Sequence, residues 1–206
     1  MVIVESGGSE SLENRILRQM FEARKQVFVD LLKWDVPVVD GRFELDEFDD
    51  EHASYIVVAD REGNHAGSAR LLPTTRPHIL GGLFPELCAG PAPAGPDIFE
   101  ITRFCLGRTE GAPTRRKTRN RLVSALVSFA LEHGIRTYTG VAEMAWLQQI
   151  LAFGWDCRPL GAPLSFRGRL IGALAIGIAS DTPALLDRNG IWDAEAPELA
   201  RVAAAA

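Results

Sequence analysis

The segment from Phe99 to Cys105 constrains the fold most, because it combines the composition of a strand with two charged side chains. β-Branched and aromatic residues dominate it, and Pro96 and Gly107 interrupt regular structure on either side. Glu100 and Arg103 are costly in a buried strand unless they are paired or face a polar cleft. Strand alternation puts them on opposite faces, so both can serve one cleft only if a bulge separates them. The alternative is a surface strand with two solvated charges.

The order of the predicted elements indicates an α/β fold, with a mixed sheet between two layers of helices. The elements are a helix capped by Ser9 or Ser11 and ending near Leu32, strands over 55–59 and 66–72, a central strand over 98–106, a helix over 122–131 and a strand over 135–141. The strand, helix and strand in the middle predict a parallel pair, and a cleft would open where this pair splays apart. With no repeat or linker, we expect one domain over residues 1–206.

Composition excludes several classes of protein. The net charge of −5 gives no support to a nucleic-acid-binding protein. Cys88, Cys105 and Cys157 are far apart and have no metal-ligand spacing, so we expect reduced thiols, no metal and a cytoplasmic protein. The first eight residues do not resemble a signal peptide, and the longest apolar run, residues 170–179, is too short to cross a bilayer.

Charged side chains also occur in two other elements that should be half buried. Arg24 lies in the apolar stripe of the first helix, and Arg70 lies within the second strand. For Arg24, the helix alone favours a packed stem with the guanidinium reaching water over a buried ion pair. Six acids in residues 44–51 would ordinarily form a solvated loop. The interleaved Leu45 and Phe48 indicate instead that this acidic segment packs against the rest of the protein. Carboxylates held in place in this way would suit a cationic ligand.

A basic cluster precedes the apolar helix. It has five cations in seven residues: Arg115, Arg116, Lys117, Arg119 and Arg121. Cations near a helix start oppose the helix dipole, so an anionic ligand is one explanation for them. The other explanation, a solvated basic face, applies to most of the five.

Several short motifs occur together in a fixed order. They are Arg24-x-x-x-Phe28, Trp34, Asp40-Gly41, Glu44-x-Asp46-x-Phe48-Asp49, Arg70-Leu-Leu-Pro-Thr74 and Glu100-Ile-Thr-Arg-Phe104. This set resembles the acyl-homoserine-lactone synthases, the LuxI-type autoinducer synthases of bacterial quorum sensing, most strongly over residues 21–108. The resemblance implies a three-layer α-β-α fold similar to GNAT-type N-acetyltransferases, with the first 52 residues covering S-adenosylmethionine.

The resemblance also implies a reaction without a cofactor, because S-adenosylmethionine is a substrate. Its amine attacks the thioester of an acyl-acyl carrier protein or an acyl-CoA, and its carboxylate then displaces methylthioadenosine to close the lactone. The residues implied for S-adenosylmethionine binding are Arg24, Phe28, Trp34, Asp46, Asp49, Arg70, Arg103 and Phe104. Asp46 and Asp49 would hold the cationic groups of the ligand, pair with the arginines, or do both.

Glu100 is the candidate general base for the amine, and its rival role is to position Arg103 or the ammonium group. A backbone amide between Phe104 and Leu106 would stabilise the oxyanion, and we expect Cys105 to serve packing.

The acyl donor is expected to use two further regions. The implied acyl-chain pocket consists of Phe84, Leu106, Thr139, Gly140, Val141, Met144 and Leu147. The carrier protein or CoA would dock on Arg115, Arg116, Lys117 and Arg119, which suit an anionic donor. Two other functions stay open: an acyl-CoA-dependent N-acyltransferase of the same fold acting on an ordinary amine, and a non-catalytic ligand sensor.

Overall fold

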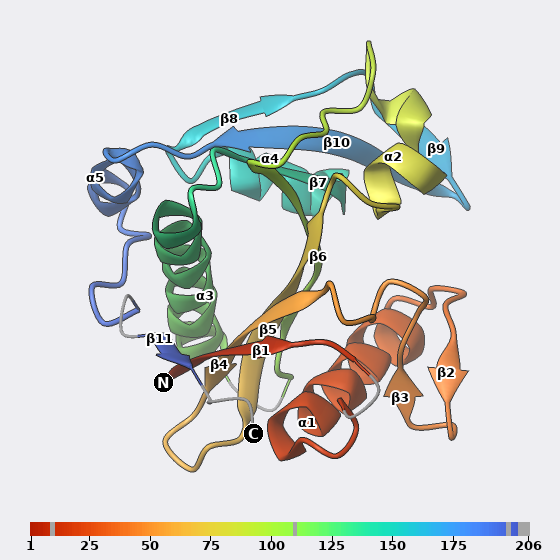
Figure 1. Ribbon diagram of the computed structural model, residues 1–206, viewed down its shortest axis with the longest axis vertical. Coiled ribbons are helices and arrows are strands. Elements are labelled where there is room, and N and C mark those ends of the chain that lie inside the picture. The colour runs from red at the N-terminus through yellow and green to blue at the C-terminus, as the bar shows by residue number, and fades with distance from the viewer. Residues whose placement is uncertain (9–10, 109–110, 197–198, 202–206) are drawn as a thin grey trace. The chain divides into compact units, whose positions relative to one another are not determined.

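The computed structural model describes residues 1–8, 11–108, 111–196 and 199–201 (Figure 1). The chain divides into two compact units, which we describe separately. Unit 1 comprises Met1–Leu71, Arg103–Ala125 and Ala194–Ala206. Unit 2 comprises Leu72–Thr102 and Leu126–Asp193.

The sheet of unit 1 places strands in the order β11-β1-β4-β5. Their bounds are β1 Val2–Ser6, β4 Ser54–Ala59, β5 His65–Pro73 and β11 Leu199–Arg201. β1 runs antiparallel to β4 and parallel to β11, and β4 and β5 form the predicted antiparallel pair. Strand β1 was not predicted. Its alternation is weak, because only its first two residues, Val2 and Ile3, are buried.

The first helix begins later than predicted. Helix α1 spans Arg15–Arg24, and the Asn14 side chain caps it by accepting hydrogen bonds from the amides of Ile16 and Leu17. The expected cap at Ser11 is therefore wrong, and Ser9 lies outside the described residues. The chain continues as a π-helix, η1, over Lys25–Leu31.

A short hairpin follows η1. Strands β2, Val38–Val39, and β3, Phe43–Glu44, are joined through Asp40 and Gly41, whose φ angles are 53° and 65°. Positive φ at two successive residues is the requirement of a type I′ turn, and Asp-Gly is among the pairs that meet it. The hairpin has a functional consequence, because it places Glu44 in a buried position.

The sheet of unit 2 has the order β6-β7-β10-β8, with β9 paired to β10. The strands are β6 Ile98–Leu106, β7 Thr137–Glu143, β8 Asp156–Pro159, β9 Leu164–Phe166 and β10 Arg169–Gly177. β6 and β7 are parallel, and their pairing runs from Ile98 opposite Thr137 to Glu100 opposite Thr139. Both strands continue past the last pair, as a splayed parallel pair should. The predicted α/β class, a mixed sheet flanked by helices, is confirmed.

The remaining helices are α2 Ile79–Leu83, η2 Pro85–Leu87, α3 Ala112–His133, α4 Met144–Leu151 and α5 Thr182–Arg188. Helix α3 begins ten residues before its apolar part, so the basic cluster lies on the helix. Gly134 ends α3 with φ 70°, as expected for a C-terminal glycine. Within the described ranges, no helix is long and apolar enough to cross a membrane.

Candidate active site

The centre of unit 1 is a buried ionic network built around Arg24. The Arg24 guanidinium donates through Nε to Glu44 Oε2, and through Nη1 and Nη2 to the two carboxylate oxygens of Asp49 at 2.8 and 2.9 Å. The Arg24 side chain is 1% exposed. The expectation that this guanidinium reaches water is therefore wrong, because carboxylates 20 and 25 residues away supply its partners inside the protein.

Arg70 and Arg103 extend this network. Arg70 donates to both Asp46 oxygens and pairs with Asp49 Oδ1 at 2.8 Å. Arg103 donates through Nη2 to Asp46 Oδ2 at 2.7 Å and to Glu44 Oε1 at 2.9 Å. The predicted pairing of the aspartates with the arginines is thus observed.

The network balances three guanidinium groups against three carboxylates, which is the condition for burying so much charge. Burial alone would lower the pKa of Arg24, but Asp49 and Glu44 raise it above its usual range. Burial alone would raise the pKa of Asp49, but Arg24 and Arg70 hold it well below its usual range. Arg24 and Asp49 therefore both carry their charges at neutral pH.

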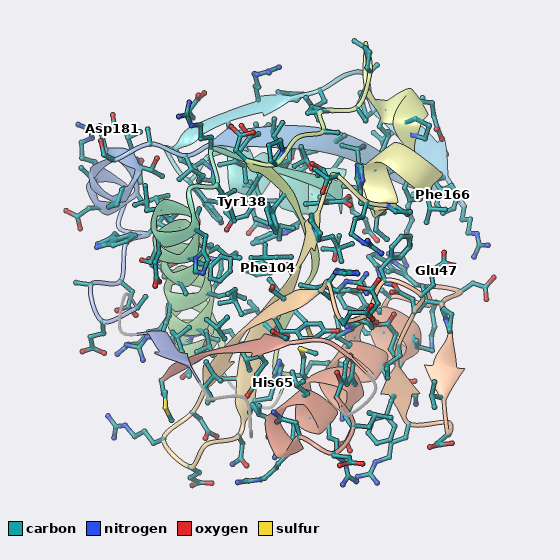
Figure 2. All side chains as sticks on the ribbon, in the orientation of Figure 1. Glu47, His65, Phe104, Tyr138, Phe166 and Asp181 are labelled. Atoms are coloured by element: carbon teal, nitrogen blue, oxygen red, sulfur yellow. The ribbon has the colours of Figure 1, made fainter. Side chains whose placement is uncertain are left out.

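Exposure separates the six side chains of the network into an interior and an edge. The side chains of Arg24, Glu44, Asp49 and Arg70 are at most 1% exposed, whereas those of Asp46 and Arg103 are each 9% exposed. Glu47, next to Asp46, is fully exposed and lies outside the network (Figure 2). Asp46 and Arg103 are therefore the members that a ligand can touch without disrupting the interior.

Two aromatic rings lie against this edge. Phe28 and Trp34 are stacked with their centroids 4.8 Å apart, and the Arg103 guanidinium lies 5.6 Å and 6.0 Å from the two rings. Phe28 belongs to the π-helix η1, and the Trp34 amide donates to the Phe28 carbonyl at 2.8 Å. This turn folds Trp34 back onto Phe28, and the aromatic faces form a surface that attracts cations. Phe104 follows Arg103 in the chain and is half-buried (Figure 2).

Strand β6 is irregular at Arg103, where φ is 51°. This left-handed conformation is uncommon for a residue with a Cβ atom. Burial alternates regularly at Glu100 and Thr102, but the next fully buried residue is Cys105. The alternation therefore shifts by one position at Arg103, as it would at the bulge that the two charges need if both are to serve one cleft.

Glu100 lies in unit 2 and is fully buried. Its two carboxylate oxygens accept hydrogen bonds from the first two amides of α2: Oε2 from Ile79 at 2.7 Å and Oε1 from Leu80 at 2.9 Å. These two contacts fix the orientation of the carboxylate. The interpretation of β6 as a surface strand with solvated charges is excluded at Glu100.

The residues expected to line an acyl pocket fall into several groups. Phe84 and Val141 pack on a core cluster that contains Leu80, Leu87, Ile171 and Ala173. Met144 and Leu147 both approach the position of Gly172, and Thr139 and Gly140 are buried on β7. Leu106 belongs to unit 1, where it packs beside Gly67. Six of the seven therefore belong to unit 2.

The basic cluster lies on the first turns of α3. Arg115, Arg116 and Lys117 are exposed, whereas Arg119 is half-buried and donates to Asn120 Oδ1. Arg121 pairs with Glu195. The exposure of these three cations fits both interpretations, a docking surface for an anionic partner and a solvated basic face.

Sequence reasoning missed two members of the site. Glu44 was treated as one acid of a run, although it joins Arg24 to Arg103. The Tyr55 hydroxyl donates to Asp49 Oδ1 at 2.9 Å and adds a neutral donor to the network. The available signal for Glu44 was the Asp40-Gly41 pair, which predicts a hairpin whose second strand is Phe43–Glu44.

Cys105 is fully buried, and burial raises the pKa of its thiol to about 12. The expectation that it serves packing is confirmed, because a thiol in this environment is not an effective nucleophile. Among the described residues, no group of three or more His, Cys, Asp or Glu side chains could hold a metal ion.

This geometry can be compared with proteins of known structure or function. The fold is shared with a Lactobacillus plantarum protein assigned as an N-acetyltransferase, at a TM-score of 0.55 and 15% identity over 86% of this chain and 99% of the other. Residues 9–182 match the autoinducer synthase family, to which this chain belongs. It is 36% identical over 182 residues to the acyl-homoserine-lactone synthase of Ralstonia nicotianae, covering 85% of this chain and 89% of the relative.

A solved member of this group is also similar over nearly the whole chain. The CoA-dependent acyl-homoserine lactone synthase BjaI, determined with S-adenosylmethionine and isopentyl-CoA, has a TM-score of 0.81 and 28% identity, covering 98% of this chain and 93% of BjaI. The comparisons confirm the class that the ordered motifs indicated: the chain is an acyltransferase of the acyl-homoserine-lactone synthase type.

Proposed function

We propose that this enzyme makes an acyl-homoserine lactone from S-adenosylmethionine and an acyl thioester. The observation that carries the proposal is the charge-balanced network of unit 1, whose accessible edge presents a carboxylate and a guanidinium, with the half-buried Trp34 and the buried Phe28 beside them. S-adenosylmethionine carries an ammonium, a carboxylate and a sulfonium, so each of its charged groups has a complementary partner at this edge.

Asp46 and Arg103 would contact the ligand directly, because they are the network members with exposed surface. Asp46 would accept from the ammonium, and Arg103 would bind the carboxylate. Trp34 and Phe28 would lie against the sulfonium. Arg24 and Arg70 hold the two aspartates in place from the interior, so their contribution is to fix geometry before the ligand arrives.

The chemistry then requires a base and an oxyanion donor. Glu100 would take a proton from the ammonium, directly or through one water, and the free amine would attack the thioester carbonyl. A backbone amide between Phe104 and Leu106 would stabilise the oxyanion until the thiolate leaves. The carboxylate oxygen of the acylated intermediate then attacks the carbon bonded to the sulfonium, and methylthioadenosine departs as the lactone ring closes.

The acyl donor would be anionic, whether it is an acyl-acyl carrier protein or an acyl-CoA. Arg115, Arg116 and Lys117 on α3 are exposed and would dock either donor, with Arg119 beside them. The acyl chain would lie in unit 2, among Phe84, Thr139, Gly140, Val141, Met144 and Leu147.

Coupled product release tests this proposal. Purified enzyme should release thiol and methylthioadenosine in a one-to-one ratio when it receives both substrates, and neither product when one substrate is omitted. Thiol release with an ordinary amine in place of S-adenosylmethionine would identify a simple N-acyltransferase instead. Binding of S-adenosylmethionine without either product, for every donor, would identify a ligand sensor.

A further inference from the structure

The short segment before α2 has two unusual features, both close to Glu100. The first is His78, which is 7% exposed and directly precedes the helix. Its Nδ1 lies 2.8 Å from the Arg76 carbonyl oxygen. A carbonyl only accepts, so Nδ1 carries a proton. Nε2 is buried and has no hydrogen-bond partner among the described residues.

The second feature is Gly81, in the middle of α2. A Cβ atom at this position would lie 2.6 Å from His78 Nε2 and 2.7 Å from Cε1. The imidazole ring therefore lies directly on the glycine and leaves no room for a side chain. The neighbouring Gly82 is different, because nothing lies within 4 Å of the Cβ position there.

Both features carry a cost. An unpaired buried ring nitrogen is unfavourable, and glycine is a poor residue for a helix interior. They occur in the one turn whose amides hold Glu100, since Ile79 and Leu80 follow His78 and precede Gly81. The first helical hydrogen bond of α2, from the Gly82 amide to the His78 carbonyl, closes the same turn.

We propose that His78 is a positioning residue for Glu100. Its ring is held between the Arg76 carbonyl and Gly81, and it fixes the first turn of α2 so that the Ile79 and Leu80 amides meet both carboxylate oxygens. Gly81 is the residue that makes this arrangement possible. The inference rests on the proposed role of Glu100 as the base that deprotonates the amine of S-adenosylmethionine.

The test compares Gly81→Ala with Gly82→Ala, which adds the same methyl group to the same helix. In full-length enzyme, G81A should lower kcat about tenfold or more while the KM for S-adenosylmethionine changes less than about twofold. G82A should leave both unchanged. Equal behaviour of the two variants would contradict the proposal.

A second substitution separates positioning from general damage to the fold. Asparagine can reproduce the donation from Nδ1 to the Arg76 carbonyl but lacks the atoms that reach Gly81. His78→Asn should therefore lower kcat by itself, because the ring contact is lost, and G81A should cause no further loss in the double variant. If G81A is as damaging in the H78N background as in the wild type, the ring contact is not the cause and the proposal fails.

Hydrogen exchange gives a readout that does not depend on activity. The Ile79 and Leu80 amides should exchange at least about tenfold faster in G81A than in the wild type or G82A. Unchanged exchange would overturn the positioning role even if activity fell. Faster exchange together with wild-type kcat would preserve the packing argument but reject Glu100 as the base, so the two failures are distinguishable.

Discussion

Arg24 and Asp49 form a bidentate ion pair in which both side chains are 1% exposed, although 25 residues separate them in the chain. The pair ties helix α1 to the acidic segment that follows β3. Because the charges are out of water, their favourable interaction depends on complete pairing, and a partner left alone is costly. The first 50 residues are therefore tied to β5 and β6 by ion pairs to Arg70 and Arg103 as well as by apolar packing such as that of Phe21 on Tyr55. The same charges include the proposed ligand contacts.

Replacing Arg24 by Ala should destabilise the protein by about 3–5 kcal/mol, because Glu44 and Asp49 would remain buried without their main partner. Denaturant unfolding measures this loss. Arg42→Ala is the matched control, since Arg42 pairs with Glu22 at the surface and should cost at most about 1 kcal/mol. Equal losses in the two variants would show that the buried pair has no special role.

Asp46→Asn and Glu44→Gln should have opposite profiles. Asp46 lies at the exposed edge, so D46N should weaken S-adenosylmethionine binding at least about tenfold with a smaller loss of stability. Glu44 is fully buried and bonds two arginines, so E44Q should lose mainly stability. Titration calorimetry measures the S-adenosylmethionine affinity of both variants, and unfolding curves measure their stability. A larger loss of affinity in E44Q than in D46N would contradict the assignment of ligand contact to Asp46 and of stability to Glu44.

Glu100→Gln should lower kcat about 10²–10⁴-fold with little change in S-adenosylmethionine affinity, because it removes the base and leaves the ligand edge intact. Stability must be measured in parallel, since the new amide NH2 group would face a backbone N–H donor of α2. Glu86→Gln is the control, because Glu86 is an exposed acid of the neighbouring 3₁₀ turn. Wild-type turnover in a folded E100Q variant would reject the base assignment.

His65 should make stability depend on pH in mild acid. Burial lowers the pKa of this imidazole to about 4 in the folded protein, against about 6.5 in the unfolded chain. Between these values the unfolded chain binds the extra proton, so stability should fall as pH drops from 6.5 to 4, by up to about 1.4 kcal/mol per pH unit. His65→Gln keeps a partner for Ser68 Oγ and cannot titrate, so unfolding curves of H65Q should be flatter over this window. If the stability of the wild type and of H65Q depends on pH equally over this window, His65 does not cause the pH dependence.

Charge reversal at Arg115, Arg116 and Lys117 should raise the KM for the acyl donor by about tenfold or more and leave the KM for S-adenosylmethionine unchanged. Added salt should also raise the KM of the wild-type enzyme for the acyl donor, because salt screens the attraction between the cations and the anionic donor. Arg61→Glu, in the exposed turn after β4, controls for a nonspecific change in net charge. If the KM for the acyl donor changes with neither the charge reversal nor salt, the basic cluster is a solvated face that does not bind the donor.

The sequence was sufficient to predict the central elements of the fold. The central strand was predicted over residues 98–106, and β6 has the same bounds. The parallel β6–β7 pair also followed from local patterns, because a crossover helix between two strands leaves few alternatives. The irregularity at Arg103 was foreseen only as a condition, since the two charges could serve one cleft only with a bulge between them. These features depend on residues that are close together in the chain.

The missed features depend on distant partners or on overlooked turn chemistry. Nothing near Arg24 in the sequence shows that Glu44 and Asp49 return to it, so a solvated guanidinium was the better expectation from its helix alone. Strand β1 is specified by its pairing with β4 more than by its own composition. The amides that hold Glu100 lie 20 and 21 residues before it. In contrast, the Asp40-Gly41 hairpin was a local signal that could have been used.

The most direct test of the central claim is mass spectrometry of the products made by purified enzyme from S-adenosylmethionine with matched panels of acyl-acyl carrier proteins and acyl-CoAs. We predict an acyl-homoserine lactone and methylthioadenosine in equal amounts, with the productive panel identifying the donor. The absence of both products with every donor, from protein that is folded and binds S-adenosylmethionine, would contradict the account.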